Sequence, residues 1–225
     1  MKSQLTKKIL PALLILSIVG LTIHYHRAEL NRFPSYIHAW TQADYYSVAI
    51  GFTENGYDFF HPQTFILNKQ FPDNFGKAYP NAITSIDFPI NQYIPALFMG
   101  LTGTLSPFWM RFYNLVYSLI GLLFLFLLAR RISSNPVAPY AIVLFVSLSP
   151  VFIYYQATFI PTIPSLANSI IGYYFFFVHL QSKRRKDFWL AILFFTLAAL
   201  SRTPFAIFLM AALCHHLILA IEKRS

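Results

Sequence analysis

Charged residues are scarce in this sequence. Only 11% of its 225 residues are Asp, Glu, Lys or Arg, whereas a soluble domain carries roughly 25%. The chain therefore lacks the charge that a water-soluble surface needs. Its single cysteine, Cys214, excludes an intrachain disulfide, and the sequence contains no Cys/His zinc spacing. With 56% hydrophobic residues, the composition is typical of an integral membrane protein.

Acidic residues are the rarer of the two charged classes. There are 8 of them against 17 Lys and Arg, which gives a net charge of +9. In a soluble protein this excess would suggest nucleic acid as a partner. Here the basic residues lie mainly between apolar runs, so we exclude nucleic acid binding and expect membrane lipid as the partner.

Seven apolar runs divide the sequence. They cover residues 9–23, 90–104, 112–129, 137–155, 163–180, 188–200 and 205–221. A membrane-spanning helix needs about 20 apolar residues, so the shorter runs are marginal. The run at 90–104 is crowded by Pro89 and Pro95 near its start, which favours an interfacial or re-entrant helix over a span.

The basic residues decide which runs cross the membrane, because Lys and Arg concentrate in cytoplasmic loops. If the run at 90–104 does not cross, eleven of the 17 basic residues fall on the cytoplasmic face. These are Lys2, Lys7, Lys8, Arg130, Arg131, Lys183, Arg184, Arg185, Lys186, Lys223 and Arg224. The same topology makes the break around Arg202 and Pro204 an external hairpin.

The sequence therefore predicts an all-α integral membrane protein with about six transmembrane helices and both termini in the cytoplasm. We expect one membrane domain, residues 1–225. Its parts are a first span at 9–25, a long external loop at 26–107 with amphipathic juxtamembrane helices, and five further spans within 108–225. The first span has the basic start of a secretory signal without a cleavage pattern, so it is interpreted as an uncleaved anchor.

The external loop carries most of the acidic side chains. Six of the eight lie in it: Glu29, Asp44, Glu54, Asp58, Asp73 and Asp87. A connector of about eighty residues is far longer than two helices require, which indicates a folded functional element. Within it, Thr41 and Asp44 have the spacing of a helix capping box, and Asn55-Gly56 predicts the end of that helix.

A series of short motifs carries a family resemblance. In order they are Trp40-Thr41-Gln42-Ala43-Asp44-Tyr45-Tyr46, Gly56-Tyr57-Asp58-Phe59-Phe60-His61-Pro62, Ile86-Asp87-Phe88-Pro89, Leu101-Thr102-Gly103, Trp109-Met110-Arg111-Phe112, Ser149-Pro150, residues 159–164 and Leu200-Ser201-Arg202-Thr203. Their order and topology resemble the N-terminal half of the polyprenyl-phosphate-sugar-dependent membrane glycosyltransferases of the GT-C superfamily. That branch contains the protein O-mannosyltransferases and the lipid A aminoarabinose transferase.

The resemblance implies a site on the external face. It assigns Asp44 and Asp87 as catalytic carboxylates and as ligands of a divalent metal, Mg, Mn or Zn. Asp87 stands where the family more often has Glu, and Thr162 stands where a third carboxylate is common. Arg202 matches the basic residue of a later external turn. A carboxylate can accept the proton of an acceptor hydroxyl, and a departing phosphate favours a cation beside it.

Two further cations are candidates for the donor phosphate. Arg111 lies at the start of a span, where an arginine that reaches the lipid headgroups is an equally good interpretation. Lys69 is more simply a solvated loop charge. Four further residues are predicted to line the substrate site: Tyr45, Tyr46, His61 and Tyr93, since aromatic rings stack on sugars.

Two classes of function remain open. The first is an inverting glycosyltransferase that moves a sugar from a polyprenyl-phosphate donor to a glycan, lipid or protein acceptor, in a bacterial inner membrane. The second is a truncated or inactive homologue that acts as a lipid-binding or scaffold subunit, with a partner subunit supplying further spans. A transporter would show repeated halves and charged residues inside spans, and neither pattern is present.

Overall fold

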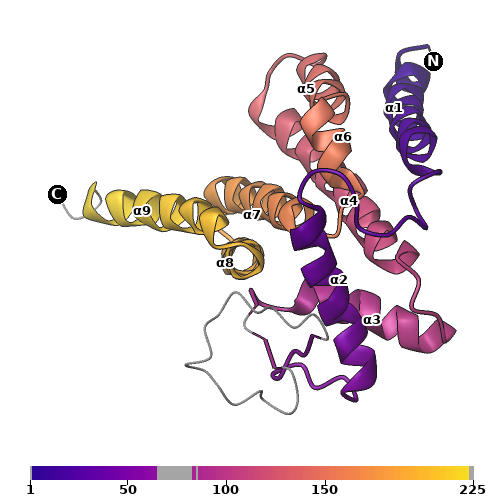
Figure 1. The fold of residues 1–225 in the computed structure, drawn as a ribbon. Helices are drawn as coiled ribbons and strands as arrows, with labels where there is room; N and C mark the ends of the chain where they lie inside the picture. Colours follow the sequence, from indigo (N-terminus) through magenta and orange to yellow (C-terminus); the bar gives the residue numbers. More distant parts are fainter. Residues whose placement is uncertain (1, 65–82, 85, 223–225) are drawn as a thin grey trace.

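The structure is a computed structural model that describes residues 2–64, 83–84 and 86–222. The described chain is helical, with one isolated bridge between Gln63 and Ile83 and no strand. Its helices are α1 (Lys2–His26), α2 (Ala39–Glu54), α3 (Ile90–Thr102), α4 (Phe108–Ile132), α5 (Ala138–Ser147), α6 (Pro150–Gln156), α7 (Thr162–Ser182), α8 (Arg185–Ser201), the 3₁₀ turn η2 (Thr203–Phe205) and α9 (Ala206–Glu222). The all-helical prediction is therefore confirmed for this part of the chain (Figure 1).

Within the described residues, two helices are long and apolar enough to cross a membrane. They are α4 and α7, with 25 and 21 residues. The run at 137–155 was predicted as one span, but the structure divides it into α5 and α6, which meet at an angle of 64°. Pro150 starts α6, and proline cannot continue the hydrogen-bond ladder of the preceding helix. The bent pair raises the number of candidate spans to three.

The other apolar stretches in the described helices are shorter. Residues 10–26 of α1 and residues 203–219 around α9 are apolar over 17 residues each, and α8 also has 17 residues. The six-span topology thus stays a prediction. The helix α3 has only 13 residues, about 20 Å at 1.5 Å per residue, and is not among the candidate spans. Its position as an interfacial or re-entrant helix stays a prediction.

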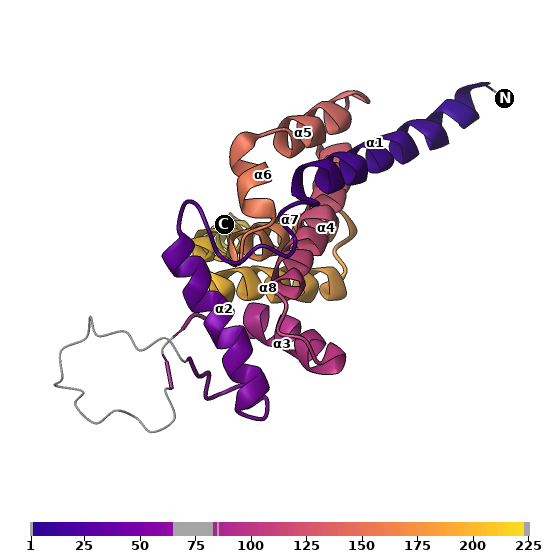
Figure 2. The ribbon, with the colours of Figure 1, turned by 45° about the vertical axis from the view of Figure 1, so that its right-hand side comes forward.

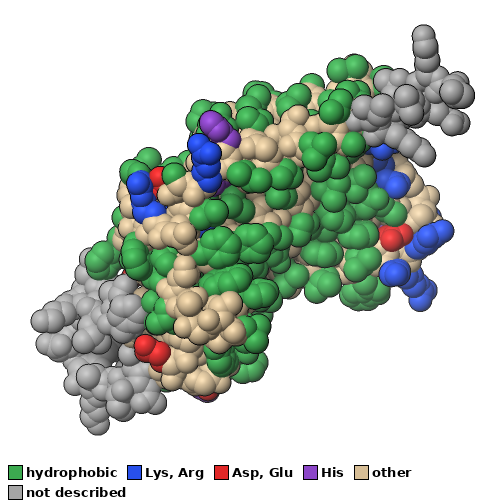
Figure 3. Space-filling model, turned by 90° about the vertical axis from the view of Figure 1, so that its right-hand side faces the viewer, with side chains coloured by type: hydrophobic (Ala, Val, Ile, Leu, Met, Phe, Trp, Pro, Cys, Tyr) green, Lys and Arg blue, Asp and Glu red, His purple; other side chains and the backbone are tan. Residues whose placement is uncertain are grey.

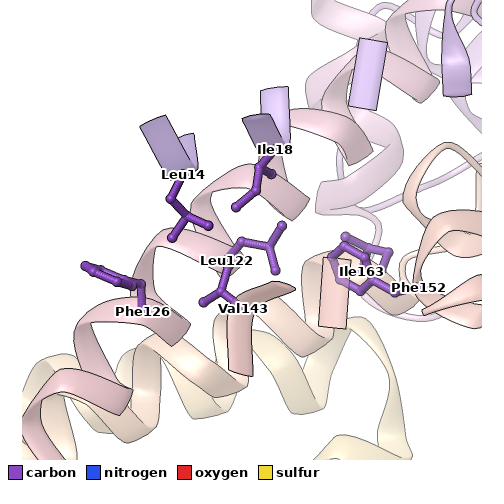
Figure 4. Packing of buried hydrophobic residues seen from close by; sticks show 7 residues of the cluster. All are labelled: Leu14, Ile18, Leu122, Phe126, Val143, Phe152 and Ile163. Carbon is purple, nitrogen blue, oxygen red and sulfur yellow. The ribbon is translucent and has the colours of Figure 1, made fainter. Parts of the chain in front are cut away.

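The centre of the bundle is formed by α4, α7 and α8. α7 packs along both neighbours, and small residues allow the close approach. A Cβ on Gly172 would lie 2.7 Å from the ring of Phe195. Beside this contact, apolar side chains of α1, α4, α5, α6 and α7 form one cluster, shown in Figure 4: Leu14, Ile18, Leu122, Phe126, Val143, Phe152 and Ile163.

Buried polar side chains also hold α1 to the bundle. Gln156 of α6 lies 3.2 Å from the ring nitrogen of His26 and donates to Thr22 (3.1 Å) and Ser118 (2.8 Å). Hydrogen bonds of this kind fix helix positions where water is excluded. The end of α1 is therefore tied to both α4 and α6.

Two basic clusters lie at one end of the molecule. Arg131, in the last turn of α4, donates a hydrogen bond to Gln181 in the last turn of α7, two residues before Lys183. We name this the basic end. It supports the prediction that both clusters share a face of the membrane. Figure 3 shows a broad hydrophobic surface with Lys and Arg gathered towards its margins.

The helix α2 begins earlier than the capping box predicts. α2 starts at Ala39 after His38, whose φ of 60° is left-handed, and the structure gives no side-chain cap there. The prediction of Thr41 as the cap is therefore wrong, and Asp44 lies in the second turn. The predicted end is right, because Asn55 caps the helix and Gly56 has φ of 72°. α2 packs against α3, as Figure 2 shows from a second direction.

Candidate active site

Asp44, Tyr45 and Asp87 lie where α2 meets the segment before α3. Asp44 and Tyr45 belong to α2, whereas Asp87 lies just before α3. The Tyr45 hydroxyl donates a hydrogen bond of 3.3 Å to Oδ2 of Asp87. The two residues are 42 positions apart in the sequence, and the packing of α2 against α3 brings them into contact. The two predicted carboxylates thus flank one tyrosine.

Asp44 has the features of an available base. Its side chain is partly buried, and the part of the chain described here offers no hydrogen bond or salt bridge to its carboxylate. Partial burial raises the pKa of Asp44 above its usual value, because loss of water disfavours the charged form. A higher pKa brings the carboxyl closer to the working pH, where a general base is most effective.

Arg202 reaches the same place from the other half of the chain. It follows the last residue of α8 with φ of −153° and ψ of 116°, an extended backbone that directs it away from the helix. The backbone N–H of Phe88 donates to the carbonyl oxygen of Leu200 over 3.1 Å, so the segment carrying Asp87 is joined to the segment carrying Arg202.

Thr162 fixes the guanidinium of Arg202. Nη1 of Arg202 donates a 2.6 Å hydrogen bond to Oγ1 of Thr162, the first residue of α7. The family resemblance marked Thr162 only as a missing acid. A neutral hydroxyl at this position orients the guanidinium without pairing its charge, so the positive charge stays open to an anion.

The pKa of Tyr45 is shifted by burial and by the charges around it. Burial raises this pKa most, the negative charge of Asp87 raises it further, and Arg202 lowers it. The hydrogen bond with Asp87 and the charge of Asp44 raise it again, and the result is about 12. Tyr45 therefore keeps its proton at physiological pH and donates to Asp87. Tyr45 is therefore the residue that interacts with each of the other three, Asp44, Asp87 and Arg202.

Arg111 has a different environment. Its side chain is buried, and its guanidinium donates to the carbonyl oxygens of Arg32 (2.8 and 3.0 Å), Phe33 (3.3 Å) and Ala157. It also lies over the ring of Phe159 at 4.6 Å. These contacts join the segment after α1 to the segment after α6. The structure accounts for Arg111 as a clamp, and its role at the donor phosphate stays a prediction.

The predicted lining residues other than Tyr45 have three different environments. Tyr46 is 7% exposed and donates to the carbonyl oxygen of Leu105, so its ring belongs to the core. Tyr93 packs edge to face against Phe59 at 5.1 Å, and Phe59 in turn contacts Phe88, the neighbour of Asp87. His61 is exposed and lies 2.7 Å from Asp58. Lys69 lies outside the described residues.

A divalent metal would find two carboxylates here. Among the residues described, no three His, Cys, Asp or Glu side chains form a group that could hold a metal ion. Zinc usually takes four such ligands. Mg²⁺ instead binds through one or two carboxylates, keeps several waters and shares oxygens of a substrate phosphate. Carboxylates such as Asp44 and Asp87 are ligands of the kind that Mg²⁺ and Mn²⁺ use, and metal binding by this chain stays a prediction.

Two contacts of this site were missed in the sequence. One is the Tyr45–Asp87 hydrogen bond, and the other is the Arg202–Thr162 hydrogen bond. For the second contact, the sequence offered Thr162 at the start of α7 and Arg202 directly after α8 as polar residues that could pair. Their pairing depends on how α7 packs against α8, which spacing along the chain does not give.

Comparison with known proteins identifies a family. A family model described as dolichyl-phosphate-mannose-protein mannosyltransferase matches residues 87–225, which is more than half of the chain. This range includes Asp87, Thr162 and Arg202, whereas α2 with Asp44 and Tyr45 lies before it. Neither a curated protein nor a solved structure matches.

Proposed function

The chain belongs to the dolichyl-phosphate-mannose-protein mannosyltransferase family, and we propose that it transfers a sugar from a polyprenyl-phosphate donor to an acceptor on the external face. The family indicates a membrane glycosyltransferase of the GT-C type. The acceptor is a glycan, lipid or protein hydroxyl. The carrying observation is the convergence of Asp44, Tyr45, Asp87 and Arg202 from three distant segments.

The proposed reaction is a single displacement. Asp44 accepts the proton of the acceptor hydroxyl, while the oxygen of that hydroxyl forms a bond to the anomeric carbon. The bond from that carbon to the phosphate oxygen breaks, and polyprenyl phosphate leaves with the electron pair. Attack opposite the leaving group inverts the anomeric centre. Asp44 is assigned as the base because burial raises its pKa and its carboxylate is free of hydrogen bonds from the described residues.

Arg202 is assigned to the departing phosphate. The charge on the phosphate oxygens grows as the bond breaks, and a guanidinium held in place by Thr162 meets that charge without reorganising. If Mg²⁺ were bound, Asp87 would be the carboxylate that holds it, and the ion would supply additional stabilisation of the charge on the phosphate. Tyr45 orients Asp87 through its hydrogen bond.

The position of the site supports the external face. Thr162 and Arg202 lie at the start of α7, whereas the basic end lies at its other end near Ser182. Since Lys and Arg concentrate on the cytoplasmic side, the site belongs on the opposite face. We therefore propose a plasma-membrane protein, the inner membrane in a bacterium, with both termini in the cytoplasm.

The test is donor binding by the purified chain in detergent, with a labelled polyprenyl-phosphate mannose and with or without Mg²⁺. We expect saturable binding that Arg202→Gln weakens about 10- to 100-fold, the usual range for a charge-assisted hydrogen bond. Arg131→Gln serves as the control because Arg131 lies at the basic end. Absence of saturable binding in the wild type would reject the proposal.

A second measurement separates the enzyme from the scaffold alternative. Asp44→Asn should bind the donor as the wild type does and fail to transfer the sugar. If the wild type binds the donor, and no labelled sugar reaches added glycan, lipid or peptide acceptors or water, the chain is a donor-binding subunit and not a transferase.

A further inference from the structure

An apolar groove runs between α1 and α5, near the basic end. It has a volume of about 570 Å³ and is lined by Leu10, Leu13, Leu14, Ser17, Pro136, Val137, Tyr140 and Leu144. Seven of these eight side chains are hydrophobic. The groove lies on a part of the molecule that faces the bilayer core if α1 spans the membrane, and it is separate from the site that contains Asp44 and Arg202.

The floor of the groove is well packed. Leu14 of α1 and Val143 of α5 belong to the same buried cluster as Phe126 of α4, and Figure 4 shows Leu14 on α1 directed towards α4 with Phe126 beside it. The walls are open by comparison, because Leu13 is 53% exposed and Val137 is 64% exposed. A closed floor with exposed apolar walls has the shape of a channel for one hydrocarbon chain.

A basic side chain lies next to this groove. The guanidinium of Arg130 sits over the ring of Phe126 at 5.7 Å, and that ring contacts Tyr140 edge to face at 5.1 Å. Tyr140 is a groove residue. The rim is also ordered, because the backbone N–H of Val137 donates 2.9 Å to the side chain of Asn135. The rings of Phe126 and Tyr140 thus link Arg130 to the groove, near the turn from α4 to α5.

Arg131 provides a natural comparison. It follows Arg130 in sequence, but it hydrogen-bonds to Gln181 and lies over the ring of Tyr174 at 5.5 Å. Both partners belong to α7. The two neighbouring arginines thus point to different sides of α4, and only the environment of Arg130 leads to the groove.

We propose that this groove binds an anionic phospholipid, with one acyl chain between α1 and α5 and its phosphate at Arg130. The apolar walls suit a hydrocarbon chain, and the charge of Arg130 complements an anionic headgroup at the level where the chain ends. Basic pockets between transmembrane helices on the cytoplasmic side bind anionic headgroups by this combination. The proposal does not depend on the transferase reaction.

Native mass spectrometry of the purified chain tests this. Phosphatidylglycerol and phosphatidylcholine with identical acyl chains are titrated against wild type, Arg130→Gln and Arg131→Gln. We expect the wild type to prefer phosphatidylglycerol, and Arg130→Gln to reduce that preference about fivefold, the contribution of one basic residue near a membrane surface. Arg131→Gln should retain the preference. No preference in the wild type, or equal losses in both variants, would overturn the proposal.

A second pair of variants tests the groove itself. Ser17→Trp places a large ring in the groove and should weaken binding of both lipids. Ile15→Trp, on the same helix, at a residue 51% exposed and outside the groove, should leave binding unchanged. Equal effects of these two variants would overturn the acyl-chain assignment. Displacement of the lipid by equimolar soluble glycerol phosphate would do the same, because it would indicate a headgroup site without a chain site.

Discussion

At the scale of single residues, the site is defined by how charge is neutralised or left open. Asp87 receives a hydrogen bond from Tyr45, Arg202 is oriented by the neutral Thr162, and Asp44 keeps a free carboxylate within the described chain. These environments separate the roles that the two carboxylates can play. Asp44 is suited to proton transfer, and Asp87 to positioning.

Replacement of Asp44 by Asn should lower sugar transfer about 100- to 10,000-fold, the usual contribution of a general base. In the wild type, the transfer rate should fall as pH drops through the raised pKa of Asp44, because the base becomes protonated. The residual rate of Asp44→Asn should lack this dependence. Glu54→Gln, an exposed position on the same helix, is the control. A wild-type pH profile that survives in Asp44→Asn would remove Asp44 from the base role.

Replacement of Tyr45 by Phe removes the donor to Asp87 and should lower the transfer rate about tenfold, as expected for a hydrogen bond to a charged group. Since the pKa of Tyr45 is about 12, the phenol remains protonated at lower pH and the loss should be equal from pH 6 to 9. Transfer assays over this range measure it, with Tyr25→Phe in α1 as the control. A rate equal to that of the wild type would show that Asp87 needs no such partner.

At the scale of elements, the site depends on the register between α7 and α8. Thr162 begins α7 and Arg202 follows α8, so their hydrogen bond requires these helices to pack at a fixed distance. Gly172 permits that distance, because any Cβ there would meet Phe195. Small residues serve the same purpose in many membrane helix pairs.

Gly172→Leu should therefore destabilise the protein by about 1–3 kcal/mol, the usual cost of overpacking a core. It should also weaken donor binding, because α8 must move away and carry Arg202 with it. Thermal unfolding in detergent and donor titration measure the two effects. Gly20→Leu in α1 is the matched control, since a Cβ on Gly20 meets nothing within 4 Å. Equal unfolding temperatures for the two variants would contradict the packing argument.

At the scale of the whole molecule, the chain has two chemically different ends. Arg131 and Gln181 meet at one end, and at the other Arg202 contacts Thr162 at the start of α7 while Phe88, before α3, contacts Leu200 of α8. This polarity is what the distribution of basic residues predicts for a protein that sits in one orientation in a membrane.

Cysteine labelling can measure that orientation. In a Cys214→Ser background, a membrane-impermeant maleimide should react with Thr104→Cys in intact cells and with Ser134→Cys only after the membrane is opened. Both positions are exposed, and they precede and follow α4 respectively. Labelling of both from outside, or of Ser134→Cys alone, would refute the topology.

The sequence by itself determined the class of the molecule. Apolar runs and scarce charge predict a helical membrane protein, because lipid leaves no alternative partner for the backbone groups of an isolated chain segment. The order of the motifs around Asp44, Asp87 and Arg202 predicted the candidate site residues, and the family match confirms the predicted superfamily.

Only the tertiary structure decided how these residues meet. The start of α2 at Ala39, the 64° bend between α5 and α6, and the use of Thr162 as a partner of Arg202 all differ from or add to the sequence prediction. The bend has a local cause in Pro150, whereas the contact of Thr162 with Arg202 depends on packing between residues 40 positions apart. The start of α2 depends on competition between neighbouring turns. Periodicity describes a helix from its own residues, whereas a contact such as Phe88 to Leu200 exists only when the surrounding helices bring the two backbones together.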